Sequence, residues 1–212
     1  MRRARRREAR CDFAFNFSIP KACKVTTEEL LALPDDGTER WLLMGQLREK
    51  RIRTQPSKQS RTLGRARCRI MATSVYALMK WLKLQQEPRG EILCGEAGCR
   101  FGRNPDTTVG IDVVYIAANL VMQESEDTTL IDGVPTLIIE ILSPSDAFKE
   151  IKEKIDLYQK FRVPLIWVID PHDRTITVYR LDAEPELVNI RQELIGDPHL
   201  PGFRVAAAEI FA

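Results

Sequence analysis

The stretch GVPTLIIEILSPSDAFKEIKEKIDLYQKFRVPLIWVIDPHDRTITVYR at residues 133–180 decides the fold of this 212-residue chain. Its first apolar run, 136–142, predicts a buried strand that contains one charge, Glu140. A helix is expected next, because Ser143 can cap it and Pro144 suits its first position. The face expected to meet the sheet consists of Phe148, Ile151, Ile155, Tyr158 and Arg162. Apolar residues at 165–169 predict a second strand, and alternation at 175–181 predicts a third after a tight turn. The unit is therefore a strand–helix–strand crossover within a mixed sheet.

The rest of the chain predicts further helices and strands around that unit. Helices are expected at 26–33, which opens on a capping box, and at 70–86, where apolar residues recur at helical spacing. Expected strands are two within 41–52 around Gly45, a pair at 91–94 and 97–101 that turns near Gly95, and single strands at 111–116 and 187–194. Segment 55–69 is polar and basic without a clear period, 122–132 is an acidic surface loop, and 201–212 is a short closing element. This order predicts an α/β (α+β) fold with a central mixed β-sheet flanked by helices.

Composition and charge restrict the domain organisation and the compartment. The net charge of +2 hides a contrast, because residues 1–10 carry six arginines against Glu8 and the remaining chain is about −3 by subtraction. We therefore expect 1–24 to be a basic, disordered N-terminal extension and 25–212 to be a single domain. No signal peptide and no apolar run of membrane-spanning length is present, so a cytoplasmic protein without a membrane partner is expected. Five cysteines fit reduced thiols, and two histidines make a zinc site an unfavourable interpretation.

Two carboxylates inside apolar strands are the main indication of function. Glu140 is flanked by apolar residues on both sides, and Asp112 lies near the start of the expected strand 111–116. An ionised carboxylate in such a place costs several kcal/mol unless a cation or hydrogen bonds compensate it. Two acids from neighbouring strands can hold a divalent cation, and such hard oxygen ligands suit Mg²⁺ or Mn²⁺. The alternative is an ordinary salt bridge between Glu140 and a basic side chain.

Two lysines of the crossover helix are candidates for the group that faces Glu140. Lys152 and Lys154 flank the buried face at similar angles, so helical periodicity does not choose between them. Lys154 has Tyr158 one turn later on its own side and could extend along that ring towards the sheet. The alternative for either lysine is a solvated position on the flank of the helix.

A set of short motifs runs through the central unit: Val134-Pro135, Ile139 to Ser145, Lys154, Tyr158, Val163-Pro164, Trp167 and Asp170-Pro171. With these motifs the chain resembles the Uma-two family of bacterial proteins, which are assigned to endonucleases of the restriction-endonuclease-like PD-(D/E)XK fold. The resemblance covers about residues 25–212 and includes the N-terminal helix and the hairpin at Gly45. The resemblance implies that Asp112 and Glu140 are the two acids of the fold's signature. The signature lysine would fall at Leu142, and Lys154 of the following helix matches the migrated lysine known within this fold.

The chain also departs from the family pattern at several positions. Ile111 stands where the signature has proline, and Met44 and Gln46 replace acidic residues of the family's N-terminal hairpin. The histidine that often precedes the long helix is absent from 57–68.

The resulting hypothesis is a metal-dependent endonuclease that acts on DNA. Asp112, Glu140 and the carbonyl of Ile141 would bind Mg²⁺ or Mn²⁺, and Lys154 would stabilise charge on the phosphate or orient the water. A homodimer is a further expectation, because cutting both strands usually needs two active sites. No organic cofactor is expected, since the chain lacks a phosphate-binding loop and a dinucleotide fingerprint. The alternative, favoured by the departures at Ile111, Met44 and Gln46, is a catalytically lapsed nuclease fold that binds nucleic acid or a protein without cutting.

Overall fold

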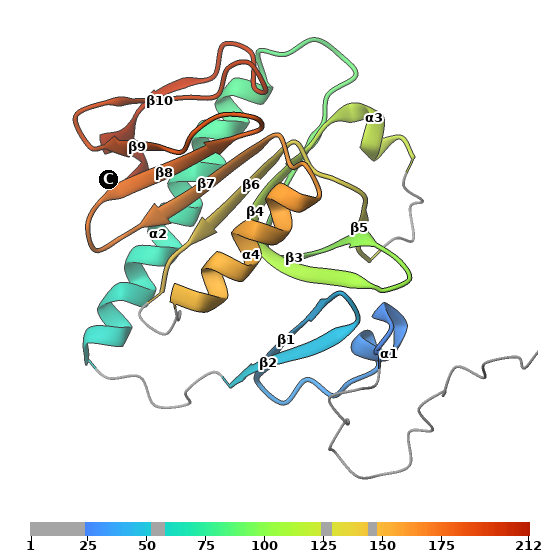
Figure 1. The fold of residues 1–212 in the computed structure, drawn as a ribbon. Coiled ribbons are helices and arrows are strands. Elements are labelled where there is room, and N and C mark those ends of the chain that lie inside the picture. The colour runs from blue at the N-terminus through green and yellow to red at the C-terminus, as the bar shows by residue number, and fades with distance from the viewer. Residues whose placement is uncertain (1–23, 52–57, 124–128, 144–147) are drawn as a thin grey trace, which may run out of the picture.

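The computed structural model describes residues 24–51, 58–123, 129–143 and 148–212, and in these ranges a large mixed sheet lies between two helices (Figure 1). The helices are α1 Thr27–Leu31, α2 Lys58–Leu82, α3 Ala118–Val121, α4 Phe148–Lys160 and α5 Ala207–Ile210. The sheet strands are β1 Thr38–Leu43, β2 Gln46–Arg51, β3 Glu91–Gly102, β4 Thr107–Ile116, β5 Ile131–Asp132, β6 Leu137–Ile141, β7 Leu165–Asp170, β8 Thr175–Arg180 and β9 Glu186–Asn189. A separate small hairpin pairs β10 Glu193–Ile195 with β11 Arg204–Ala206.

The predicted crossover unit is confirmed as the centre of the sheet. Strands β6 and β7 pair in parallel from Leu137↔Leu165 to Ile141↔Ile169, and α4 connects them. The antiparallel strand β8 follows β7 through a tight turn. All five residues of β6 are buried, because the strand lies between β4 and β7 and is covered on both faces. The described part of α4 begins at Phe148, and Pro144, the predicted first helical residue after the Ser143 cap, lies outside the described residues.

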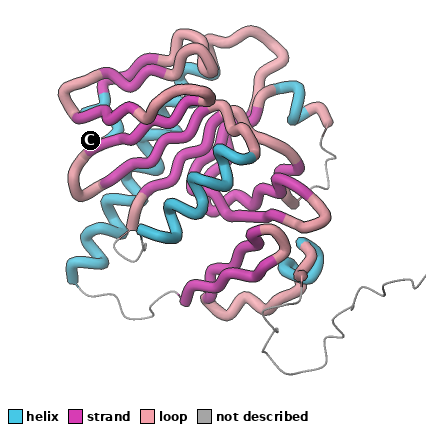
Figure 2. The backbone as a smooth tube through the Cα atoms, viewed as in Figure 1, coloured by secondary structure: helices cyan, strands magenta, loops and turns pink. Residues whose placement is uncertain are grey.

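The two faces of the sheet carry separate apolar clusters under different helices. Ile139, Ile141 and Trp167 pack against α2 through Leu78 and Trp81. The alternate residues Ile138 and Val168 pack on the other face against Leu157 and Tyr158 of α4. This alternation follows from the period of two in a strand and places α2 and α4 on opposite faces, as Figure 2 shows in the same view.

Strand β4 positions the candidate site because two strands, β1 and β6, pair with different parts of the same edge of it. Its Val113–Tyr115 segment pairs with β6, and Thr108 pairs with Leu42 of β1. The opposite edge pairs with β3 along most of its length. Gly110 and Asp112 therefore lie in an interval where neither β1 nor β6 continues the ladder.

Several predicted elements need correction. The expected hairpin of 91–94 and 97–101 is one strand, β3, because Gly95 and Glu96 form a bulge that bends the strand without reversing it. The long helix begins at Lys58, twelve residues before the predicted start at Ile70. The polar residues 58–69 are therefore helical, although no apolar period indicates a helix there. The expected strand 187–194 is divided between β9 and β10, which belong to different sheets. Arg162 leaves the helical face because the chain turns there with a φ of 58°.

Candidate active site

Asp112 is held at the end of the β4–β6 ladder by a backbone hydrogen bond. The last paired residues are Val113 and Ile139, and the next available amide, that of Ile141, donates to Asp112 Oδ2 at 2.7 Å. The side chain of Asp112 is only 1% exposed. The carboxylate of Asp112 thus accepts the hydrogen bond that a backbone carbonyl of β4 would otherwise accept from the Ile141 amide, and it is buried within the sheet.

A bulge in β3 lies directly opposite Asp112. Cys94 pairs with Val113 and Ala97 with Ile111, so Gly95 and Glu96 of β3 together oppose the single residue Asp112. Both bulge residues have positive φ, 88° at Gly95 and 62° at Glu96. Bulges of this kind redirect side chains and are frequent beside active sites. Here the bulge directs Glu96 towards the carboxylate of Asp112 and its partner.

Glu140 is buried and is contacted by two residues of one face of α4. Tyr158 donates its hydroxyl hydrogen to Glu140 Oε1 at 2.5 Å. Lys154 Nζ contacts Oε1 at 3.1 Å and Oε2 at 3.2 Å, and it also donates to the carbonyl of Gly110 at 3.1 Å. Residues four apart on a helix share a face, which explains why both side chains reach the same carboxylate. Lys152, the alternative candidate, is exposed.

Arg67 of α2 completes the cluster from the other side of the sheet. Its Nη2 atom donates to Asp112 Oδ1 and, at 2.9 Å, to Glu96 Oε1. Its Nε atom is buried without a hydrogen-bond partner among the described residues. Each of the two helices therefore supplies one cation: Arg67 of α2 pairs with Asp112, and Lys154 of α4 pairs with Glu140.

The proximity of these groups changes their proton affinities. Burial, and then the negative charge of Glu140, raise the pKa of Asp112 to about 7. Burial opposes the charge on Lys154 and is the largest single influence, but the negative charges of Glu140 and Glu96 together with the hydrogen bond to Glu140 outweigh it, so the pKa of Lys154 is raised. Burial, together with the same carboxylate, raises the pKa of Tyr158 well above its usual value. Asp112 is also linked to the strand of Glu140 through the backbone, because the amide that bonds Asp112 belongs to Ile141, the residue after Glu140.

The structure places Glu140 in direct contact with Lys154, and it links Asp112 to the amide of Ile141, the residue after Glu140. Ile141 is also present, but the contact seen is made by its amide, and metal ligation by its carbonyl stays a prediction. The salt bridge proposed as the ordinary alternative for Glu140 is present, with Lys154 as its partner. This pair is compatible with either a structural or a catalytic role.

Sequence reasoning missed Arg67 and Glu96. Arg67 lies in the polar segment 55–69, which is helical from Lys58 onward although no apolar period indicates a helix there. Glu96 lies in what had been expected to be a simple turn. A third acid, Glu39 of β1, is near enough for its charge to raise the pKa of Lys154, although less than Glu140 does.

The departures from the family pattern lie away from these carboxylates or in the core. Ile111 is fully buried among apolar residues. The amide of Met44 donates to Thr107 Oγ1 at 3.2 Å, at the far end of β4. Thr107 is separated from Asp112 by about 17 Å of strand. Gln46 is exposed in the same hairpin.

The donor set fits a hard divalent cation with few protein ligands. Across the described ranges, no three His, Cys, Asp or Glu side chains gather closely enough to form a metal cage. Mg²⁺ commonly binds proteins through one or two carboxylates and keeps water and substrate phosphate as its other ligands. The Asp112–Glu140 pair satisfies that requirement in donor type and number.

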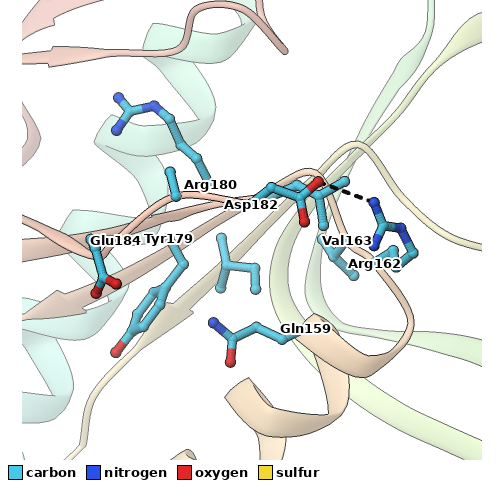
Figure 3. Close-up of a pocket in the computed structure, with 10 residues that line it drawn as sticks. Gln159, Arg162, Val163, Tyr179, Arg180, Asp182 and Glu184 are labelled. Carbon is cyan, nitrogen blue, oxygen red and sulfur yellow. Dashed lines mark hydrogen bonds and ion pairs between the residues drawn. The ribbon is translucent and has the colours of Figure 1, made fainter.

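Two surface cavities lie apart from the cluster. One, of about 420 Å³, is formed between the end of α4 and β8 and has Gln159 and Tyr179 in its wall and the Arg162–Asp182 ion pair at its margin (Figure 3). The other, of about 510 Å³, is formed by residues that follow α2 together with Tyr115 and His199. None of Asp112, Glu140 and Lys154 lines either cavity.

Among the helices that the structure describes, none is long and apolar enough to cross a membrane.

Comparison with known proteins identifies a family and similar solved structures. The model of the Uma2 family, described as "Putative restriction endonuclease", matches residues 59–208. A crystal structure from Anabaena variabilis, described as "a putative nuclease belonging to DUF820", matches with a TM-score of 0.68 and 20% sequence identity, covering 88% of this chain and 97% of that one. No curated protein matches the chain. The structural likeness confirms the expected restriction-endonuclease-like fold.

Proposed function

Since the chain belongs to the Uma2 family, we propose that it is a metal-dependent endonuclease that hydrolyses phosphodiester bonds in DNA. The descriptions of the family and of the solved neighbour support a nuclease, and the choice of DNA and of Mg²⁺ or Mn²⁺ is part of the proposal. The observation that supports it is the buried pair of Glu140 with the ammonium group of Lys154, next to a second buried carboxylate, Asp112, which the amide of Ile141 holds beside the same strand. Structural ion pairs seldom bury two neighbouring acids, because each carboxylate raises the cost of ionising the other.

Asp112 and Glu140 would hold the divalent cation, which supplies an acidified water and neutralises charge that develops on the phosphate. The protein's own task is to keep both carboxylates oriented. The Ile141 amide fixes one oxygen of Asp112, and the Tyr158 hydroxyl fixes one oxygen of Glu140. Such supporting contacts typically affect metal affinity or activity by about 10- to 100-fold.

Lys154 would act on the phosphate as a positioned point charge. Its Nζ contacts both oxygens of Glu140 and the Gly110 carbonyl, so its position is determined by β4 and β6 and not only by its own helix. An ammonium group held in this way can stabilise negative charge without reorganising when the charge develops.

A cleavage assay with matched variants tests this function. Supercoiled plasmid and single-stranded DNA would be incubated with Mg²⁺ and then with Mn²⁺. We expect Glu140→Gln to abolish nicking, while Glu91→Gln, an exposed strand glutamate, retains it. Lys154→Met should lower the rate by about 100-fold or more, and Lys152→Met should leave it within about twofold. Nicking that persists in Glu140→Gln would exclude the proposed centre.

A second candidate is a lapsed nuclease fold that binds nucleic acid without cutting. The observation that favours it is that both carboxylates already have cationic partners, Arg67 on Asp112 and Lys154 on Glu140. DNA binding by the wild-type protein, together with no nicking at any Mg²⁺ or Mn²⁺ concentration, would support this candidate.

A further inference from the structure

Arg67 makes an unusual contact for a residue that only supports the fold. A single nitrogen atom, Nη2, is shared between the buried Asp112 and the half-exposed Glu96, whose side chain is 45% exposed. The neighbouring Nε atom is buried without a partner within the described ranges, although a fixed structural arginine usually satisfies its donors. The guanidinium is thus bonded at one edge only, between two competing acceptors.

The charges of the cluster show why this arrangement matters for a divalent cation. Asp112 and Glu140 are matched by Arg67 and Lys154, so these four side chains carry no net charge. A divalent cation placed between the same carboxylates would bring two further positive charges into contact with them and would compete with Arg67 for Asp112 Oδ1. Like charges at such distances repel strongly in a partly buried site.

We propose that Arg67 is a movable counter-ion of the active site, which rests on Asp112 when no divalent cation is bound and is held by Glu96 when one binds. The inference rests on the proposed metal-dependent function and adds a residue that regulates access of the ion. Glu96 is suited to the second position because it already bonds the same nitrogen atom and lies at the outer margin of the cluster. The bulge at Gly95 and Glu96 places it there.

The same movement would prepare the site for its substrate. Two bonded groups make up the charged cluster, Arg67 with Asp112 and Glu96, and Lys154 with Glu140. Together they contain three acids and two bases, so a bound divalent cation leaves one positive charge in excess. One phosphodiester group carries one negative charge. The arginine at the margin would then present its free donors to a phosphate oxygen, a contact for which a guanidinium is well suited.

The alternative is that Arg67 is a fixed counter-ion that keeps Asp112 ionised and oriented. The two roles predict opposite effects on metal binding. If Arg67 competes with the ion, removing its charge strengthens binding. If Arg67 only supports Asp112, removing it leaves two adjacent carboxylates without compensation, and the ion binds more weakly.

Calorimetric titration with Mn²⁺ in the absence of DNA, at pH 8, distinguishes these roles. We expect Arg67→Gln to lower the Kd by about 10-fold or more, the size of effect given by one charged hydrogen bond. Glu96→Gln should raise the Kd by about threefold or more, because the arginine loses its second acceptor. Arg69→Gln, an exposed arginine two residues along α2, should change the Kd by less than about twofold.

The outcomes separate this inference from the proposed function. Unchanged or weaker Mn²⁺ binding by Arg67→Gln, with binding by the wild type, overturns the movable counter-ion and leaves the metal centre standing. Absence of binding in the wild type and in every variant, with circular dichroism showing a folded chain, overturns both. If Arg67→Gln does not fold, Glu96→Gln decides alone, and an unchanged Kd in that variant overturns the inference.

Discussion

At the scale of single residues, Asp112 should make the stability of the metal-free protein depend on pH. Burial, and then the negative charge of Glu140, raise the pKa of Asp112 in the folded state to about 7, from the ordinary value of 3.8 that applies to the unfolded chain. Between these values the folded state binds more protons than the unfolded state. The free energy of unfolding therefore falls as pH rises from about 4 to 7, by up to about 1.4 kcal/mol per pH unit from this group.

Urea unfolding at pH 5, 6, 7 and 8 measures this effect when the wild type is compared with Asp112→Asn. The difference in unfolding free energy between the two proteins should grow as pH rises, in favour of the variant. A constant difference across the four pH values would show that Asp112 does not titrate in this range.

The residue scale also shows what the sequence could and could not reveal about the site. Asp112 and Glu140 could be predicted because a lone charge within an apolar strand is conspicuous. Arg67 could not, because several arginines lie in the polar first half of the long helix and no apolar period separates one from another. Only the packing of α2 across the sheet places Arg67, and not Arg65 or Arg69, beside Asp112.

At the scale of elements, α4 is attached to the sheet by a polar contact as well as by its apolar face. Tyr158 is fully buried, and its hydroxyl bonds Glu140 of β6. Tyr158→Phe keeps the ring but removes a donor from a buried carboxylate, so we expect a loss of about 1–3 kcal/mol in the free energy of unfolding. Tyr76→Phe, on an exposed side chain of α2, should cost less than about 0.5 kcal/mol.

Urea denaturation of both tyrosine variants provides the measurement. Equal stability of Tyr158→Phe and the wild type would mean that water or another group replaces the hydroxyl, and the attachment of α4 would then be apolar only.

Elements with strong local signals were predictable, and those decided by distant pairing were not. The strands β6 and β7 are short apolar runs followed or preceded by proline, and the capping box at Thr26 is purely local. The sequence of β3 predicts a hairpin wrongly, because a glycine between two apolar runs permits either a reversal or a bulge. Pairing with β4 on both sides of Gly95 selects the bulge, and that information is distant in sequence.

At the scale of the whole molecule, the C-terminal segment belongs to the core rather than to its periphery. It contributes apolar side chains that are at most 2% exposed and that pack with Trp81 and Trp167 under α2. These are Leu194, Leu200, Phe203 and Ile210. Burying four such side chains stabilises a fold by roughly 6–12 kcal/mol, comparable to the total stability of a typical domain.

Removal of residues 193–212 should therefore unfold the protein. Loss of the near-ultraviolet circular dichroism signal and rapid trypsin digestion would show it. As a control, Leu187→Ala removes a side chain that is 62% exposed and should leave both measurements almost unchanged. A truncated chain that resists trypsin as the full chain does would contradict the assignment of this segment to the core.

The two-against-one pairing opposite Asp112 has an evolutionary consequence. Deleting Glu96 would turn the irregularity into ordinary pairing, and the ladder on either side would keep its partners and its faces. One codon could then be lost or regained without rebuilding the scaffold, while the acid that bonds Arg67 would disappear or return. Among relatives, the count of residues between Cys94 and Ala97 is therefore a simple trait by which to sort centres whose arginine has a second acceptor from those whose arginine has none.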